Sequence, residues 1–213
     1  MESHVQGGTR WKRFAVVMVP SLAATAAVGL GLAQGALAAS FSVSGQSFKV
    51  KAERLEGNGF VQYGAYADGY TMEGKETAHP VAVSGFKSAT IENMCQSVVT
   101  PDVPLVGTVT MRLTAGTGDA PVKAKNLYLD VADLDADATF KNIDIGVAAK
   151  DAGKGPGMQP GTEGKANPFG FAQQADTAVL TNVEQRAWAT TAGTFTLSDL
   201  SLRLHRGTDK ECY

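Results

Sequence analysis

The sequence predicts an all-β domain, built as an antiparallel β-sandwich or as a short solenoid-like stack of antiparallel meanders. The first observation is that apolar and polar residues alternate at period two after Ser40, as in residues 109–113 and 200–204. Such alternation is typical of half-buried strands. The second is that segments of the chain resemble one another, but at spacings too irregular for a true solenoid. We therefore favour the sandwich, with roughly ten strands.

The internal repeat has a short and a long form. Residues 125–131 (KNLYLDV) recur sixteen residues later as residues 141–147 (KNIDIGV). Residues 91–98 (IENMCQSV) resemble residues 180–187 (LTNVEQRA), and a Gly-Thr-x-Thr strand follows each of them. The repeat predicts two structurally related halves.

The longer repeat also decides between helix and strand. Apolar residues recur at four-residue steps from Ala175 to Ala187, as they would on one face of a helix. The partner segment holds two adjacent valines and Pro101, which do not suit a helix. We therefore predict strands in both segments.

Two irregular features are expected among the strands. The alternation changes phase at Ser198-Asp199, which predicts a bulge or a sharp bend. Residues 151–170 contain six Gly, three Pro and only Met158 and Phe169 as large apolar residues. This composition predicts a flexible loop, either a plain connection or a lid over a ligand.

The N-terminus has the pattern of an export signal. Three basic residues precede an uncharged stretch, residues 14–33, and Ala36 and Ala38 supply an A-x-A cleavage site. Cleavage would follow Ala38. A stretch of this length also suits one N-terminal hydrophobic helix that stays uncleaved as a membrane anchor. We therefore expect residues 1–38 to be a signal peptide or anchor and residues 40–213 to be a single β-rich extracytoplasmic domain.

Charge and cysteine content narrow the function. The sequence has 19 basic and 21 acidic residues. The leader holds three of the basic residues and one of the acidic residues, so 16 basic and 20 acidic residues remain after Ser40. This mild acidity offers no basic patch for nucleic acid. Cys95 and Cys212 are the two cysteines, and an exported chain meets oxidising conditions, so we predict a disulfide between them. The alternative, two free thiols of a reactive site, lacks a C-x-x-C or Cys-His pattern.

Three acidic residues form the one metal candidate in the sequence. Asp133, Asp135 and Asp137 fall on one face of a strand, because side chains alternate along it. An EF-hand loop has similar spacing, with Asp144 in its last position, but Ala138 stands where that turn needs Gly. The face is either a solvated acidic surface or a weak Ca²⁺ site.

Hydrolase chemistry has few candidate residues. After the leader, His79 and His205 are the possible bases, and no G-x-S-x-G or HExxH motif occurs. Two histidines do not make a three-His zinc site. We therefore predict no catalytic residue and no cofactor. The aromatic segment 59–70 is either a sugar-binding or lipid-binding face, or a strand with glycine turns.

Three segments carry a resemblance to a known family: residues 8–14 (GTRWKRF), residues 36–41 (ALAASF) and residues 193–197 (GTFTL). The chain resembles a family of actinobacterial, streptomycete-type exported proteins of unknown function, some of which carry the label "cholesterol esterase". The resemblance implies an envelope-associated or secreted protein and supplies no catalytic residues. No nucleophile, base and acid in the sequence support the esterase label.

Two function classes follow. In the first, a non-catalytic β-domain, secreted or held at the cell envelope by residues 14–33, binds a lipid, a glycan or a partner protein. In the second, a lipid-ester hydrolase assembles Ser, His and Asp from separate strands. The hydrolase requires His79 or His205 within hydrogen-bond reach of a Ser hydroxyl. The binding class requires an apolar cleft without such a set.

Overall fold

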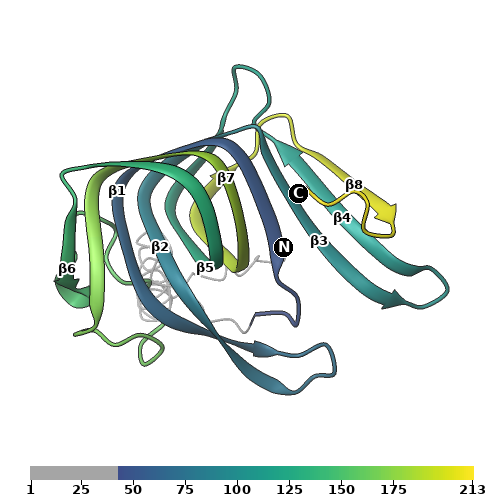
Figure 1. The fold of residues 1–213 in the computed structure, drawn as a ribbon, viewed down its shortest axis with the longest axis horizontal. Coiled ribbons are helices and arrows are strands. Elements are labelled where there is room, and N and C mark those ends of the chain that lie inside the picture. The colour runs from purple at the N-terminus through teal and green to yellow at the C-terminus, as the bar shows by residue number, and fades with distance from the viewer. Residues whose placement is uncertain (1–42) are drawn as a thin grey trace, which may run out of the picture. The chain divides into compact units, whose positions relative to one another are not determined.

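The computed structural model describes residues 43–213, which form eight strands and one short 3₁₀ helix (Figure 1). The elements are β1 (Phe48–Tyr70), β2 (Glu76–Glu92), β3 (Met94–Val103), β4 (Gly107–Ala115), β5 (Val122–Lys141), β6 (Asp144–Ala148), η1 (Ala149–Asp151), β7 (Phe171–Thr196) and β8 (Ser201–Arg206). The expected N-terminal helix, the signal or anchor and the cleavage after Ala38 lie outside the described residues. Among residues 43–213, no helix is long and apolar enough to cross a membrane.

The all-β, antiparallel prediction is confirmed, but the strands do not form the two separate sheets of a sandwich. They hydrogen-bond into one sheet in the order β6-β7-β5-β2-β1-β3-β4-β8, and β7 also pairs with β1. Strands β1, β2, β5 and β7 are therefore joined in a cycle. They have 23, 17, 20 and 26 residues, long enough for the sheet to curl over its own apolar face. Figure 1 shows these four strands curving together.

The repeated sequence segments mark the bends of these strands. Asn126 and Asn142, equivalent in the sixteen-residue repeat, have φ of 48° and 51°. Asn93 and Asn182, equivalent in the longer repeat, have φ of 50° and 53°. Asparagine tolerates this left-handed conformation better than other side chains with a Cβ atom. Each repeat therefore contains a position where the chain bends. Residues 175–187 form a strand, as predicted.

The bends of neighbouring strands line up across the sheet. The strand registers place one row of residues side by side: Asn142, Asp176, Gly59, Lys87, Asn126 and Gly193. A second row holds Asn182, Glu53 and Asn93. Three asparagine side chains in these rows donate hydrogen bonds to carboxylates: Asn93 to Glu53 (2.6 Å), Asn142 to Asp176 (2.7 Å) and Asn182 to Asp137 (2.8 Å). In both rows every second residue has positive φ, so the sheet bends along these rows, and hydrogen bonds between side chains stabilise the bends at the surface.

Both faces of the curled sheet are apolar. The inner face buries one cluster that includes Leu55, Phe60, Phe86 and Leu127. The outer face buries a second, which includes Val61, Tyr63, Val83, Tyr128 and Ala172. Neighbours such as Phe60 and Val61 fall in different clusters because successive strand side chains point to opposite faces.

The loop over residues 151–170 covers the outer cluster. The Gln159 backbone N–H donates to the Tyr63 hydroxyl oxygen (2.8 Å), and the Tyr128 hydroxyl donates to the Pro156 carbonyl (3.3 Å). Burial raises the pKa of Tyr63 to about 12, so this hydroxyl stays neutral. The loop is therefore a layer of the fold rather than a plain connection, and its flexibility stays a prediction.

Strands β3, β4 and β8 extend the sheet from the beginning of β1, and β6 pairs with β7 at the opposite edge. Asp199, with φ of 53°, lies between β7 and β8, which confirms the bend predicted at Ser198-Asp199. The strand predicted over residues 200–204 is confirmed as β8, but its expected half-buried face is wrong, because Leu202 and Leu204 are 54% and 67% exposed. Strand β8 is the edge of the sheet and pairs with β4.

The predicted disulfide between Cys95 and Cys212 is confirmed. It joins β3 to the C-terminal end of the chain. The Cys212 backbone N–H also donates to the Ser97 hydroxyl (3.1 Å), and Lys49 forms an ion pair with Glu211 (2.9 Å). The C-terminal segment is therefore fastened to both β1 and β3.

Candidate functional site

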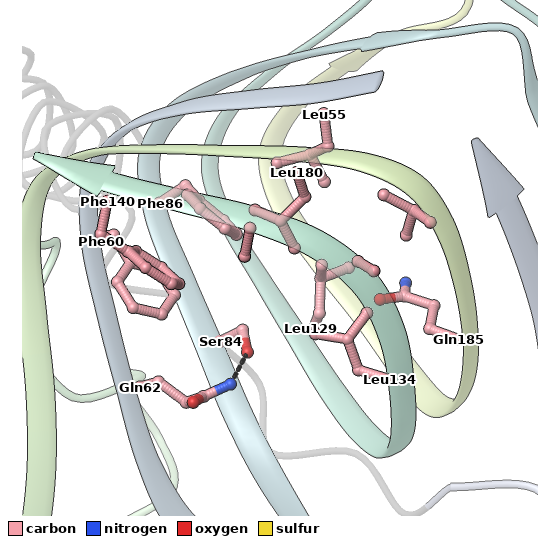
Figure 2. Close-up of a pocket in the computed structure, with 13 residues that line it drawn as sticks. Leu55, Phe60, Gln62, Ser84, Phe86, Leu129, Leu134, Phe140, Leu180 and Gln185 are labelled. Carbon is pink, nitrogen blue, oxygen red and sulfur yellow. Dashed lines mark hydrogen bonds between the residues drawn. The ribbon is translucent and has the colours of Figure 1, made fainter. Parts of the chain in front are cut away.

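The inside of the curled sheet contains a cavity of about 140 Å³ (Figure 2). One end is aromatic: the Phe60 ring lies 5.4 Å from the Phe86 ring and 5.2 Å from the Phe140 ring, measured between centroids. These rings come from β1, β2 and β5, and the tilted contacts between them are favourable. This end of the cavity offers an apolar and polarisable surface.

Aliphatic side chains form the middle of the cavity. Leu55, Leu129, Leu180 and Val183 line it and belong to the buried inner cluster. Leu134 also lines it but is 38% exposed. The cavity is therefore apolar yet reachable from solvent on the side of Leu134.

The accessible side follows from the pairing of β5. The first half of β5 pairs with both β2 and β7, whereas residues 133–141 pair with β7 alone. Leu134, Ala136 and Ala138 from this second half face the cavity and are exposed. The cavity opens beside this half-paired segment, where small side chains leave room.

Polar side chains at the cavity form a directed chain of hydrogen bonds. The Gln173 amide nitrogen donates to the Gln62 amide oxygen (2.6 Å), and the Gln62 amide nitrogen donates to the Ser84 hydroxyl oxygen (2.9 Å). Figure 2 shows the bond between Gln62 and Ser84 at the cavity wall. Because the Ser84 oxygen acts as acceptor, its own O–H remains available as a donor.

Gln185 is the third polar residue that lines the cavity. It is 5% exposed, and its side chain makes no hydrogen bond within residues 43–213. Its amide could both donate and accept. No charged side chain lines the cavity in the described part of the chain. The site can therefore hold an apolar molecule and hydrogen-bond to it, but offers no counter-ion.

The three aspartates of the metal candidate lie on the other face of β5. They share that face, as predicted, while Leu134, Ala136 and Ala138 face the cavity. Asp133 is paired with Arg186, and Asp137 accepts the hydrogen bond from Asn182. In the region that the structure describes, no group of three or more His, Cys, Asp and Glu residues could hold a metal ion.

The two histidines lie away from the cavity. His79 stacks on the Trp188 ring with 3.5 Å between centroids, and His205 lies on β8, paired with Thr110. Neither lines the cavity, and the side-chain partner of Ser84 is an amide. The described residues therefore do not assemble a Ser-His-acid set at this site.

The aromatic segment 59–70 is the second half of β1, so the strand expected in the second interpretation is present. Among its glycines, Gly59 has a positive φ, 65°, whereas Gly64 and Gly69 do not. Phe60 points into the cavity and Tyr63 lies under the loop, whereas Tyr66 and Tyr70 are 42% and 45% exposed. The segment thus contributes one ring to the cavity, and its aromatic side chains do not form one common face.

Sequence reasoning missed the polar residues of the cavity. Gln62, Ser84 and Gln185 each stand two positions from an apolar cavity residue, namely Phe60, Phe86 and Val183. A polar residue at the inward phase of an otherwise alternating strand is the signal that could have found them.

The described part of the chain coincides with a known sequence family. The model of a family of unknown function, DUF6230, matches residues 44–213. The chain belongs to the DUF6230 family. No curated protein matches it, and no solved structure does. The cavity and the disulfide of this DUF6230 member both lie inside the matched region.

Proposed function

We propose that this DUF6230 protein is a non-catalytic binding protein of the cell envelope or the secreted fraction, which takes an apolar ligand such as a lipid acyl chain into the cavity. The observation that carries the proposal is an apolar cavity that opens beside the half-paired segment of β5. The disulfide suits the oxidising conditions of an extracytoplasmic compartment. The actinobacterial origin and the export signal in residues 1–38 are part of the same proposal.

The cavity volume limits the enclosed part of the ligand. An apolar cavity of about 150 Å³ is known to hold benzene. The cavity here, of about 140 Å³, therefore suits a group of roughly six carbon atoms. A longer chain would continue outward past Leu134, where the cavity opens.

The alternative, a lipid-ester hydrolase, has weaker support. Ester hydrolysis of this type needs a base next to the nucleophilic hydroxyl. Ser84 is the hydroxyl at the cavity, and the amide of Gln62 holds its oxygen. This arrangement favours binding over catalysis.

A titration of the full chain with hexane and benzene tests the proposal, with methyl NMR as the readout. We expect shifts confined to the methyl groups of Leu55, Leu129 and Leu180, because these line the cavity. Ala138→Phe fills the opening and should abolish the shifts. Thr139→Phe, the same ring on the adjacent outward residue, is the matched control and should retain them. Shifts that persist in Ala138→Phe, or no shifts in the wild type, would overturn the proposal.

A further inference from the structure

We infer that the ligand of this cavity carries an uncharged group that both donates and accepts hydrogen bonds, a hydroxyl or a carboxamide, and that this group binds Ser84 and Gln185. The inference rests on the proposed binding function and adds the class of ligand. Its basis is the unused hydrogen-bonding capacity of these two side chains inside an otherwise apolar cavity.

The chain of hydrogen bonds that ends at Ser84 leaves its hydroxyl free to donate. Gln173 donates to Gln62, and Gln62 donates to Ser84, so each amide orients the next group. Ser84 is 5% exposed and has an O–H left to donate. A ligand oxygen in the cavity is the acceptor that this hydroxyl lacks within residues 43–213.

Gln185 adds the complementary capacity. Its side chain is buried, lines the cavity and has no hydrogen-bond partner among the described residues. A ligand that supplies both a donor and an acceptor pairs with this amide from inside the cavity, and hydroxyl and carboxamide groups do so.

The absence of charge at the cavity excludes other lipid headgroups from it. No Lys, Arg or His side chain lines the cavity in the described region, and the nearby Arg186 is paired with Asp133. Moving a carboxylate or a phosphate into such a site without a counter-ion is strongly unfavourable. A fatty acid or a phospholipid would therefore have to keep its headgroup outside.

The lining is also divided along the cavity. In Figure 2 the rings of Phe60, Phe86 and Phe140 lie together at one end, and Gln185 lies at the other, beyond Leu129 and Leu134. In the same view Ser84 lies between the rings and Gln185, so a ligand can place its apolar part against the rings and extend its polar group along the wall from Ser84 toward Gln185.

Four six-carbon ligands on the full chain test the inference: hexane, 1-hexanol, hexanamide and hexanoate at pH 7.5. We expect 1-hexanol and hexanamide to bind at least about tenfold more tightly than hexanoate, because the carboxylate has no counter-ion in the cavity and cannot donate the hydrogen bond that the two uncharged groups offer. The side-chain amide NMR signals of Gln185 should shift with these two ligands and not with hexane.

Two variants identify the side chains responsible. Gln185→Leu should weaken 1-hexanol about tenfold and leave hexane binding intact, and Ser84→Ala should do the same. Gln96→Leu is the matched control, because Gln96 lies on β3 outside the cavity. It should change neither affinity.

The outcomes separate this inference from the proposed function. If hexane binds but 1-hexanol and hexanamide show no advantage over hexanoate, the inference is wrong and the proposed function stands. The same holds if neither Gln185→Leu nor Ser84→Ala weakens 1-hexanol. If no ligand of the series shifts any cavity methyl group, both are overturned.

Discussion

Single residues in the left-handed conformation decide where the strands bend. Asn126 shows the effect of this conformation alone, because its side chain makes no hydrogen bond in the described region, whereas those of Asn93, Asn142 and Asn182 do. We expect Asn126→Ala to lower the free energy of unfolding by about 1 kcal/mol, since alanine resists positive φ. Asn126→Gly should restore it, because glycine adopts this φ freely. Urea denaturation measures both, and equal stability of the two variants would show that the φ angle is not what Asn126 provides.

Asp130 gives the fold a pH dependence. Burial raises the pKa of Asp130 to about 6, and the charge of Lys165 on the covering loop offsets this in part. Because the folded pKa lies above the unfolded one, the protonated side chain favours folding. This stability is complete below about pH 4 and is lost as the pH rises through about 6.

Asp130→Asn should therefore stabilise the protein at pH 7.5, by about 1–3 kcal/mol. It should have little effect at pH 4. Thermal unfolding at the two pH values measures the difference, with Asp135→Asn, an exposed residue of the same strand, as the control. A stabilisation of equal size at both pH values would contradict the role of burial.

At the scale of elements, the loop over residues 151–170 depends on close backbone approach. A Cβ atom at Gly155 would lie 2.6 Å from the Cβ of Val61, whereas one at Gly153 would meet nothing within 4 Å. We expect Gly155→Ala to lift the loop and cost about 2 kcal/mol or more, a typical penalty for overpacking. Gly153→Ala should be neutral. Hydrogen exchange of the loop and of Gln159 measures this, and equal protection in both variants would show that the loop is not held at Gly155.

The same elements show how far the sequence predicts the fold. Alternation located most strand segments. The longer repeat contains the bends at Asn93 and Asn182, but the repeated pattern predicted related halves and did not reveal these bends. Alternation shows that one face of a strand is buried, but not whether a second sheet or the curl of the same sheet buries it. The expectation of a sandwich assumed a second sheet. Alternation also does not reveal that Leu202 and Leu204 lie on an edge strand. The cavity depends on β5 pairing with β7 over residues far apart in sequence, which local patterns do not encode.

At the scale of the whole molecule, one covalent bond closes the chain on itself. The Cys95–Cys212 bridge spans 117 residues and encloses all the strands from β4 to β8. A loop of this size stabilises the native state by about 4–5 kcal/mol in the chain-entropy model. The ion pair of Lys49 with Glu211 fastens the same segment but is partly exposed and contributes about 1 kcal/mol or less.

The double variant Cys95→Ser/Cys212→Ser should therefore have a free energy of unfolding about 4 kcal/mol lower than that of the wild type. It should unfold at a markedly lower urea concentration. Lys49→Met, which removes the ion pair alone, should cost far less. In the native protein, alkylation followed by mass measurement should modify neither cysteine until a reductant is added. A thiol alkylated without reduction would mean that the bridge does not form in the cell, and the extracytoplasmic location would lose its support.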